Sequence, residues 1–169
     1  MQLNQQAIHR DTVRTERLTL AVLVSGVAAL ALSDFVSPIY WFMVAIVATL
    51  RWWRGSNFAL TEMQASMIGW VGFIWVGLEL LSGRAWAIAF SDFMLILSLA
   101  VTVEAATPRN HLHRLLTATF LILAAAVLTD SFLFVVPLTA WLWFMWRSAA
   151  CLYAQGLHEQ VAVQLFAAI

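Results

Sequence analysis

Long apolar segments alternate with short polar ones along almost the whole of this chain. The six apolar segments run from about Leu18 to Ser33, Val36 to Trp53, Met63 to Leu81, Trp86 to Val103, Leu115 to Thr129 and Phe132 to Leu152. A helix needs roughly 20 residues to cross the hydrocarbon core of a membrane, within a range of about 17 to 25. The pattern therefore predicts an all-α fold, a polytopic membrane protein with about six transmembrane helices in one domain at residues 17–153.

The first and fifth apolar segments are a little short for such a span. Local thinning of the bilayer, or arginine side chains that snorkel from the helix ends to the interface, would make up the difference at modest cost. The alternative is that the first two segments, or the last two, form re-entrant hairpins. The turn residues between the segments favour spanning helices.

Three of the polar links are short, so we expect each to join two helices that are antiparallel neighbours. They separate the first segment from the second, the third from the fourth, and the fifth from the sixth. Pro38 suits the first turn of a helix, and Asp130 and Ser131 suit an N-cap position. Pro108 is expected to end the fourth helix, because the residue before a proline is driven out of the helical conformation.

The arginines are distributed unequally between the two sides of the predicted membrane domain. The chain has no lysine, and one side receives Arg10, Arg14, Arg17, Arg51, Arg54, Arg109, Arg114 and Arg147. Only Arg84 falls on the other side. Because cytoplasmic loops are enriched in arginine and lysine, we expect both termini and the polar stretch 101–114 to be cytoplasmic.

The two ends of the chain are more polar than its middle. Residues 1–16 are predicted to form a cytoplasmic N-terminal segment. Residues 154–169 form the C-terminal tail, which is either the start of a further helix or an amphipathic segment on the membrane surface.

Composition supports membrane insertion and narrows the choice of partners. The chain is 63% hydrophobic and only 11% charged, whereas a soluble domain carries roughly 25% charged residues. Its formal net charge is zero, so it lacks the basic surface of a nucleic-acid-binding protein. Nine tryptophans on so small a chain exceed what one core can bury. They predict contacts with the lipid bilayer and with protein partners in a membrane complex.

Two acidic residues lie inside apolar segments, where ionisable groups are the default functional candidates. Glu79 is near the end of the third segment, and Asp92 is about 9 Å into the fourth, at about 1.5 Å per residue from Trp86. Arg84 lies in the short link between them. We expect these three residues to form a structural ion-pair cluster that fixes the two helices. The functional alternative is a proton or cation site.

Residues with catalytic or metal-binding chemistry are sparse. The four histidines lie outside the apolar segments, and His111 and His113 are expected to be solvated near the lipid headgroups. Cys151 is the only cysteine and is interpreted as a small core residue. We therefore predict no catalytic residues, no metal site and no cofactor. Three glycines of the third segment, at 69, 72 and 77, are interpreted as notches for close helix contact.

The order of these features is similar to that of a known family. An aromatic-basic run "ATLRWWRG" ends the second segment, "GLELLSGRAWA" links the third to the fourth, and "VEAATPRNHLHRLL" follows the fourth. Over about residues 15 to 155 the chain resembles the N-terminal membrane domain of bacterial transglutaminase-like membrane proteins, a domain of unknown function. The family's cytoplasmic motif is matched in register by Glu104, Thr107 and Arg109, and Arg114 closes the same stretch.

The chain also departs from the family's pattern. Ala106 and Pro108 stand where arginines are usual, Asn110 replaces aspartate, and Ala85 replaces the glutamate of a Gly-Arg-Glu link. The family's papain-like domain carries a Cys-His-Asp triad, and Cys151 in the membrane region cannot supply its nucleophile. The resemblance therefore implies a location in the bacterial plasma (inner) membrane, and transglutaminase activity is not carried over.

The leading hypothesis for function is a non-enzymatic membrane scaffold or accessory subunit of a larger membrane complex. A small proton- or cation-coupled transporter or channel that uses Glu79 and Asp92 is the first alternative. The second is a remnant or fragment of the membrane anchor of a transglutaminase-like protein.

Overall fold

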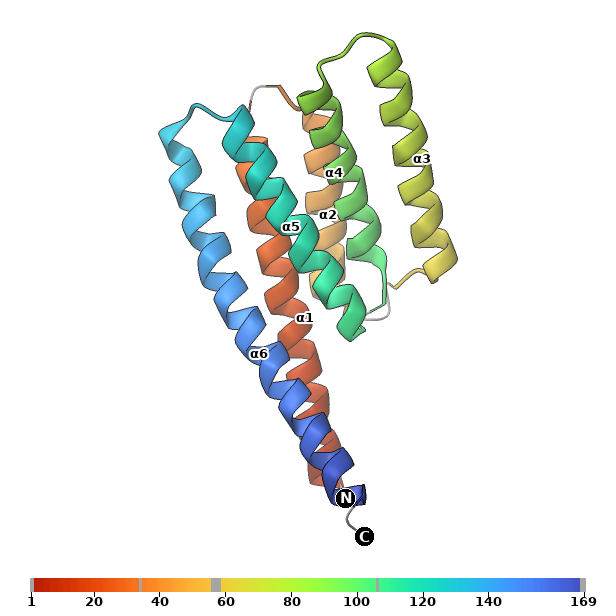
Figure 1. Ribbon diagram of the computed structural model, residues 1–169, viewed down its shortest axis with the longest axis vertical. Helices are drawn as coiled ribbons and strands as arrows, with labels where there is room; N and C mark the ends of the chain where they lie inside the picture. The colour runs from red at the N-terminus through yellow and green to blue at the C-terminus, as the bar shows by residue number, and fades with distance from the viewer. Residues whose placement is uncertain (1, 34, 56–58, 106, 168–169) are drawn as a thin grey trace.

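The computed structural model describes residues 2–33, 35–55, 59–105 and 107–167, and within them it forms six α-helices and one 3-10 turn (Figure 1). The helices are α1 (Gln2–Ala31), α2 (Pro38–Arg54), α3 (Glu62–Leu81), α4 (Trp86–Val103), α5 (Pro108–Leu128) and α6 (Val135–Ala167), with the 3-10 turn η2 (Phe132–Phe134) before α6. No strand occurs in these ranges. The predicted all-α fold with six helices is confirmed.

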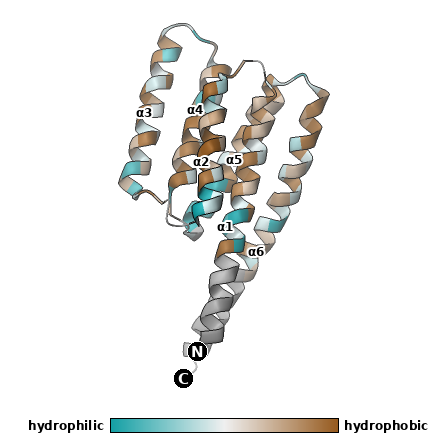
Figure 2. Ribbon diagram, turned by 180° about the vertical axis from the view of Figure 1, so that it is seen from behind, coloured by the Kyte–Doolittle hydropathy of each residue, from teal (hydrophilic) through white to brown (hydrophobic). Residues whose placement is uncertain are grey.

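Four of the helices contain stretches that are long and apolar enough to cross a membrane. These stretches are Glu62–Leu81, Trp86–Val103, Arg109–Leu128 and Phe132–Ala154. Helix α2 has 17 residues, and the apolar part of α1 follows a charged beginning. Figure 2 shows hydrophobic residues over most of the bundle's middle and strongly hydrophilic ones toward the helix ends. The composition of the helices is thus that of a membrane protein.

The core of the bundle lies where α1, α2, α4 and α5 meet. Helix α1 packs against α2, α5 and α6, and α4 packs against α2, α3 and α5. Leu23, Leu30, Leu95 and Leu121 are fully buried at the centre. Helices α3 and α6 are the outer elements, on opposite sides of the bundle (Figure 1).

One of the three expected pairs of neighbours is not closely packed. Helices α1 and α2 pack together, as do α3 and α4, but α5 barely touches α6, which lies along α1 instead. The extended backbone of Thr129 and Ser131, followed by η2, carries the chain sideways before α6 begins. The shortness of this link therefore predicted the wrong partner for α6.

Two helix starts follow from residues that the sequence shows, a proline for α2 and a serine cap for η2. Pro38 occupies the first turn of α2, and the Ser131 hydroxyl accepts a hydrogen bond from the Leu133 N–H at 3.3 Å, both as predicted. Pro108, however, begins α5 rather than ending α4, which stops at Val103. Thr107 is extended at φ −109° and ψ 156°, the conformation favoured before proline. The fifth helix is therefore not short.

The stretch 101–114 is consequently not one loop. Only 104–107 separates α4 from α5, and the next seven residues form the first two turns of α5. The ends of the chain are likewise helical: α1 begins at Gln2, and α6 continues through the C-terminal tail to Ala167 without a break. The polar N-terminal segment is therefore an extension of α1, and the tail is an extension of α6.

Only one of the three glycines in α3 lies at a close helix contact. Gly72 is buried, and a Cβ atom there would meet Ile96 of α4 at 2.5 Å. Gly69 and Gly77 have nothing within 4 Å of that position. Neither therefore forms a close helix contact within the described part of this chain. Gly26 of α1 is a second close contact, because a Cβ there would approach the Ala118 carbonyl of α5 at 3.0 Å.

Candidate functional site

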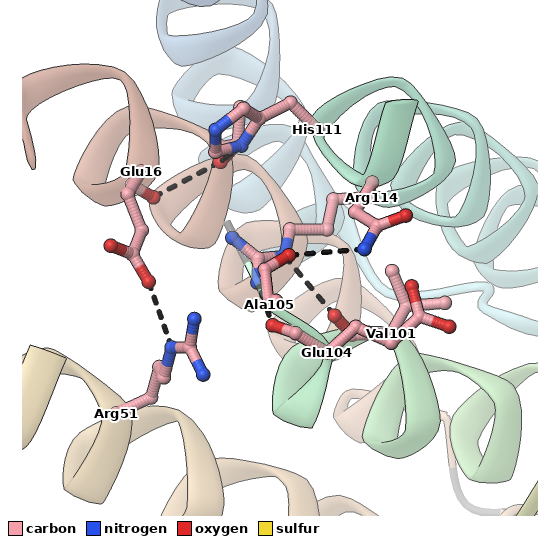
Figure 3. Close-up of polar contacts among 9 residues, drawn as sticks. Glu16, Arg51, Val101, Glu104, Ala105, His111 and Arg114 are labelled. Carbon is pink, nitrogen blue, oxygen red and sulfur yellow. Dashed lines mark hydrogen bonds and ion pairs between the residues drawn. The ribbon is translucent and has the colours of Figure 1, made fainter. Parts of the chain in front are cut away.

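Two clusters of charged and polar side chains lie at opposite ends of the bundle. The basal cluster consists of Glu16, Thr19, Arg51, His111 and Arg114, at the end where the α2–α3 and α4–α5 links lie (Figure 3). The apical clamp consists of Glu79, Arg84 and Asp92, at the α3–α4 link. A backbone hydrogen bond from the Leu60 N–H to the Val103 carbonyl, at 2.8 Å, joins the α2–α3 link to the end of α4.

An ion pair in the basal cluster ties α1 to α2. Nε of Arg51 donates to Oε1 of Glu16 at 2.8 Å, and the two side chains are 0% and 9% exposed. Nη1 and Nη2 of Arg51 are buried and have no hydrogen-bond partner among the described residues. Removing two charges from water is costly unless they pair well. This pair therefore constrains how the two helices meet.

Arg114 of the same cluster ties α5 to the end of α4. Its side chain is fully buried, Nε donates to the Val101 carbonyl at 3.1 Å, and Nη2 donates to the Glu104 carbonyl at 3.0 Å. The last carbonyls of a helix have no partner within the helix. A guanidinium that reaches them satisfies these acceptors and places positive charge at the negative end of the helix dipole.

His111 joins α5 to α1. It is 3% exposed, and its Nδ1 lies 3.1 Å from the Thr19 hydroxyl, which also donates to the Glu16 carbonyl at 3.0 Å. A hydroxyl has only one proton to donate, so we expect Thr19 to accept from His111 Nδ1–H. The expectation that both histidines are solvated is wrong for His111, whereas His113 is half-buried.

Helical periodicity explains this burial. Because α5 begins at Pro108, one face of the helix carries His111, Arg114, Ala118, Leu121 and Ala125, all of them buried. Their spacing of three or four residues is that of a single helix face. This face extends the apolar stripe of α5 into the polar stretch. This spacing can be seen in the sequence, but only if the polar residues after Pro108 are counted as part of the helix.

The apical clamp brings together the three residues expected to form an ion-pair cluster. Nη1 of Arg84 contacts Oε1 of Glu79 and lies 3.1 Å from Oδ2 of Asp92. Asp92 is fully buried, whereas the Arg84 side chain is 33% exposed. Nε1 of Trp75 also donates to Oε1 of Glu79, at 3.2 Å. The clamp therefore joins α3, the link and the first turns of α4.

The predicted cytoplasmic motif forms the boundary between α4 and α5. Glu104 follows the last residue of α4, and the Thr107 hydroxyl accepts from the Asn110 N–H at 3.2 Å as the N-cap of α5. Arg109 is exposed, while Arg114 points back to α4. These residues define a helix boundary, and they do not converge on one point.

The chemistry available to the two clusters is electrostatic. Among the described residues, no group of three histidine, cysteine or acidic side chains is placed to hold a metal ion. The Ser25 hydroxyl donates to the Val22 carbonyl of its own helix at 2.7 Å, and Cys151 is half-buried on α6. On α4, Met94, Leu95 and Val101 are buried between Asp92 and the basal end. Ser98 and Thr102 are buried there too, and their hydroxyls donate to carbonyls of their own helix at 2.7 and 2.6 Å. The clusters are therefore separated by apolar side chains and by hydroxyls that bond only their own helix.

No family model, curated protein or solved structure matches this chain. The resemblance to the N-terminal membrane domain of transglutaminase-like proteins stays a prediction. Function is accordingly inferred from the geometry of the chain itself.

Proposed function

We propose that this protein is a non-enzymatic scaffold or accessory subunit of a larger membrane complex. In this proposal all six helices span the plasma membrane of a bacterium, and both termini are cytoplasmic. The observation that carries it is the outer surface of α3. The two polar clusters support it, because each joins helices to one another and neither presents a nucleophile.

From Met67 to Leu81, Glu79 is the only polar residue of α3. The helix is packed mainly against α4. Of its residues, only Ala65 and Gly72 are buried. The exposed large side chains are Met63, Met67, Trp70, Val71, Phe73, Ile74, Trp75, Leu78, Leu80 and Leu81. A helix that is hydrophobic all round belongs in a membrane or inside a larger assembly. Aromatic residues and methionine are enriched at protein–protein interfaces, so this surface suits a protein partner within the membrane.

The docking proposal is tested on protein purified from native membranes in mild detergent. The double variant Trp70→Ala/Ile74→Ala on α3 should release a co-purifying partner. Leu123→Ala/Val127→Ala, which truncates two exposed apolar residues of α5, is the matched control and should retain it. A monodisperse monomer from native membranes for the unmodified chain would refute the proposal.

The proposed topology follows from the unequal distribution of arginines and from the arrangement of the links. An even number of spans places both termini and the α2–α3 and α4–α5 links on one side. Ala59 and Asp130 are exposed residues of opposite links, so each suits a single labelling cysteine in a Cys151→Ala background. In intact cells a membrane-impermeant thiol reagent should label Asp130→Cys and leave Ala59→Cys unlabelled. The reverse pattern would invert the orientation.

A small proton- or cation-coupled transporter is the second candidate, favoured by the burial of Asp92. Its carboxylate is fully buried, and Oδ1 has no hydrogen-bond partner among the described residues. Buried carboxylates in membrane helices often mark ion or proton pathways. The test is flux into proteoliposomes: a transporter would lose a cation-dependent flux in Asp92→Asn while keeping its fold. The third candidate, the membrane anchor of a transglutaminase-like protein, rests on the sequence resemblance alone.

A further inference from the structure

A long apolar groove lies between α1, α2 and α6. Its volume is about 740 Å³, and its walls include Ala28 of α1, Ala45 of α2 and Ala140 of α6. Two hydroxyls line it, but Thr49 donates to the Ala45 carbonyl at 2.8 Å and Ser25 also bonds its own helix. The groove therefore offers apolar surface and few free polar atoms.

The α1 wall of this groove ends in arginine. Arg14, Arg17, Ala21, Ala28 and Leu32 follow one another at intervals of three, four or seven residues, the spacing of one helix face. The small residues make the groove, and the two arginines continue the same face toward the basal end. Both arginines are exposed.

A second hollow of about 330 Å³ continues the groove at its basal end. It shares Ala21, Trp52 and Phe144 with the groove and adds Arg14 and Arg17. The Arg17 guanidinium lies over the Trp52 ring, 5.6 Å from its centroid. No carboxylate lines either hollow, and none pairs with Arg14 or Arg17 among the side chains that the structure describes. The mouth of the groove is thus positively charged.

We propose that this groove binds an anionic phospholipid, with one acyl chain between α2 and α6 and the phosphate at Arg14 and Arg17. The groove follows α1 from Leu20 to Leu32, which is about 18 Å at 1.5 Å per residue. One leaflet of the hydrocarbon core, half of about 30 Å, has nearly this depth. Guanidinium groups bind phosphate oxygens through paired hydrogen bonds. An apolar partner helix in the same groove would leave both arginines without a counter-charge, so charge favours the lipid.

The site is independent of whether the chain also docks on a larger complex. It is tested with the purified full-length protein in detergent, by native mass spectrometry during titration with phosphatidylglycerol or phosphatidylcholine of identical acyl chains. The unmodified protein should bind phosphatidylglycerol on the order of tenfold more tightly, since a basic residue near an anionic headgroup contributes about 1 kcal/mol. Arg14→Gln/Arg17→Gln should abolish this preference.

A matched control separates a specific site from general surface charge. Arg54→Gln/Arg109→Gln removes two exposed arginines at the same end of the bundle and should keep the preference. An equal loss in this control would overturn the proposal, because diffuse attraction would then explain the selectivity. Equal binding of the two lipids to the unmodified protein would also overturn it.

A groove variant tests where the acyl chain lies. Ala28→Phe fills the groove and should weaken binding of both lipids at least several-fold, and Ala45→Leu on the facing helix should do the same if Ala28→Phe fails to fold. Unchanged lipid binding in a folded variant would refute the placement of the chain. If the variant instead releases a second copy or a partner protein, the groove is a protein interface and the lipid proposal fails.

Discussion

The basal cluster and the apical clamp use the same chemistry over very different distances in sequence. In the basal cluster, Glu16 pairs with Arg51, 35 residues away, and Thr19 contacts His111, 92 residues away. In the apical clamp, Arg84 is five residues from Glu79 and eight from Asp92. The Thr19–His111 contact therefore joins α1 to α5, which are not consecutive in the chain, whereas Glu16–Arg51 and Arg114 join consecutive helices. The clamp holds one hairpin.

The two clusters also differ in exposure to solvent. Arg51 and Arg114 are almost fully buried, whereas a third of the Arg84 side chain is exposed. Exposed ion pairs contribute little to stability, and breaking a buried pair strands a charge. The comparison predicts that damage at the basal end destabilises the whole bundle, and that damage at the apical end loosens α3.

The largest effect is expected for Arg51→Met, which leaves the Glu16 carboxylate buried without its partner. We expect a loss of about 3–5 kcal/mol in the free energy of unfolding, measured by denaturant titration in detergent. Arg51→Met/Glu16→Gln should recover part of this loss. Arg54→Met, an exposed arginine at the end of the same helix, is the control and should change little. Equal stability of the Arg51 and Arg54 variants would show that the basal pair does not hold the fold.

The next effect concerns the contact between α1 and α5, which the basal cluster aligns. Gly26→Ala would place a Cβ atom 3.0 Å from the Ala118 carbonyl and 3.2 Å from Leu121 Cβ. Forced separation of a tight contact costs about 1–3 kcal/mol. Gly69→Ala, with open space around it, should instead be neutral or stabilise α3, because alanine is the better helix former. Thermal melting of both variants tests whether the tight contact is at Gly26. Destabilisation by Gly69→Ala alone would show that the sensitive contact is in α3 and not between α1 and α5.

A smaller effect is expected at the apical clamp. Arg84→Ala strands the buried Asp92, but the exposure of Arg84 limits the loss to about 1–2 kcal/mol. Arg84→Ala/Asp92→Asn should recover part of it. In limited proteolysis of Arg84→Ala, we expect the first new cleavage sites to be in the α3–α4 hairpin. Unchanged melting of Arg84→Ala, with a cation flux that Asp92→Asn abolishes, would favour the transporter over the scaffold.

The contrast between the clusters also explains why the sequence predicts the apical clamp and not the basal cluster. Glu79, Arg84 and Asp92 are close in the chain, and a short link leaves them few ways to avoid contact. The sequence places Arg51 and Arg114 on the cytoplasmic side, and Arg114 in the cytoplasmic motif, but it predicts no partner for either. A residue's position along one helix does not reveal its partner on another. The apolar segments predicted where the helices occur. They did not predict that α5 starts at Pro108, since polar residues fill its first two turns.

The smallest expected effect tests the direction of a single hydrogen bond. Thr19→Val keeps the shape of the side chain but removes the acceptor for His111 Nδ1–H, which should cost about 1 kcal/mol. Thr49→Val is the matched control, because the Thr49 hydroxyl is exposed and bonds only its own helix. It should change stability by a few tenths of a kcal/mol at most.

Nitrogen NMR of the imidazole ring shows which nitrogen carries the proton. The Thr19 hydroxyl is placed to donate its one proton to the Glu16 carbonyl, so we expect the His111 ring of the unmodified protein to hold its proton on Nδ1. Thr19→Val should shift the ring toward the Nε2–H form, because the Nδ1–H then has no acceptor from α1. If the unmodified protein already shows a bare Nδ1, the hydroxyl donates to the histidine, and the link between α1 and α5 runs in the opposite direction.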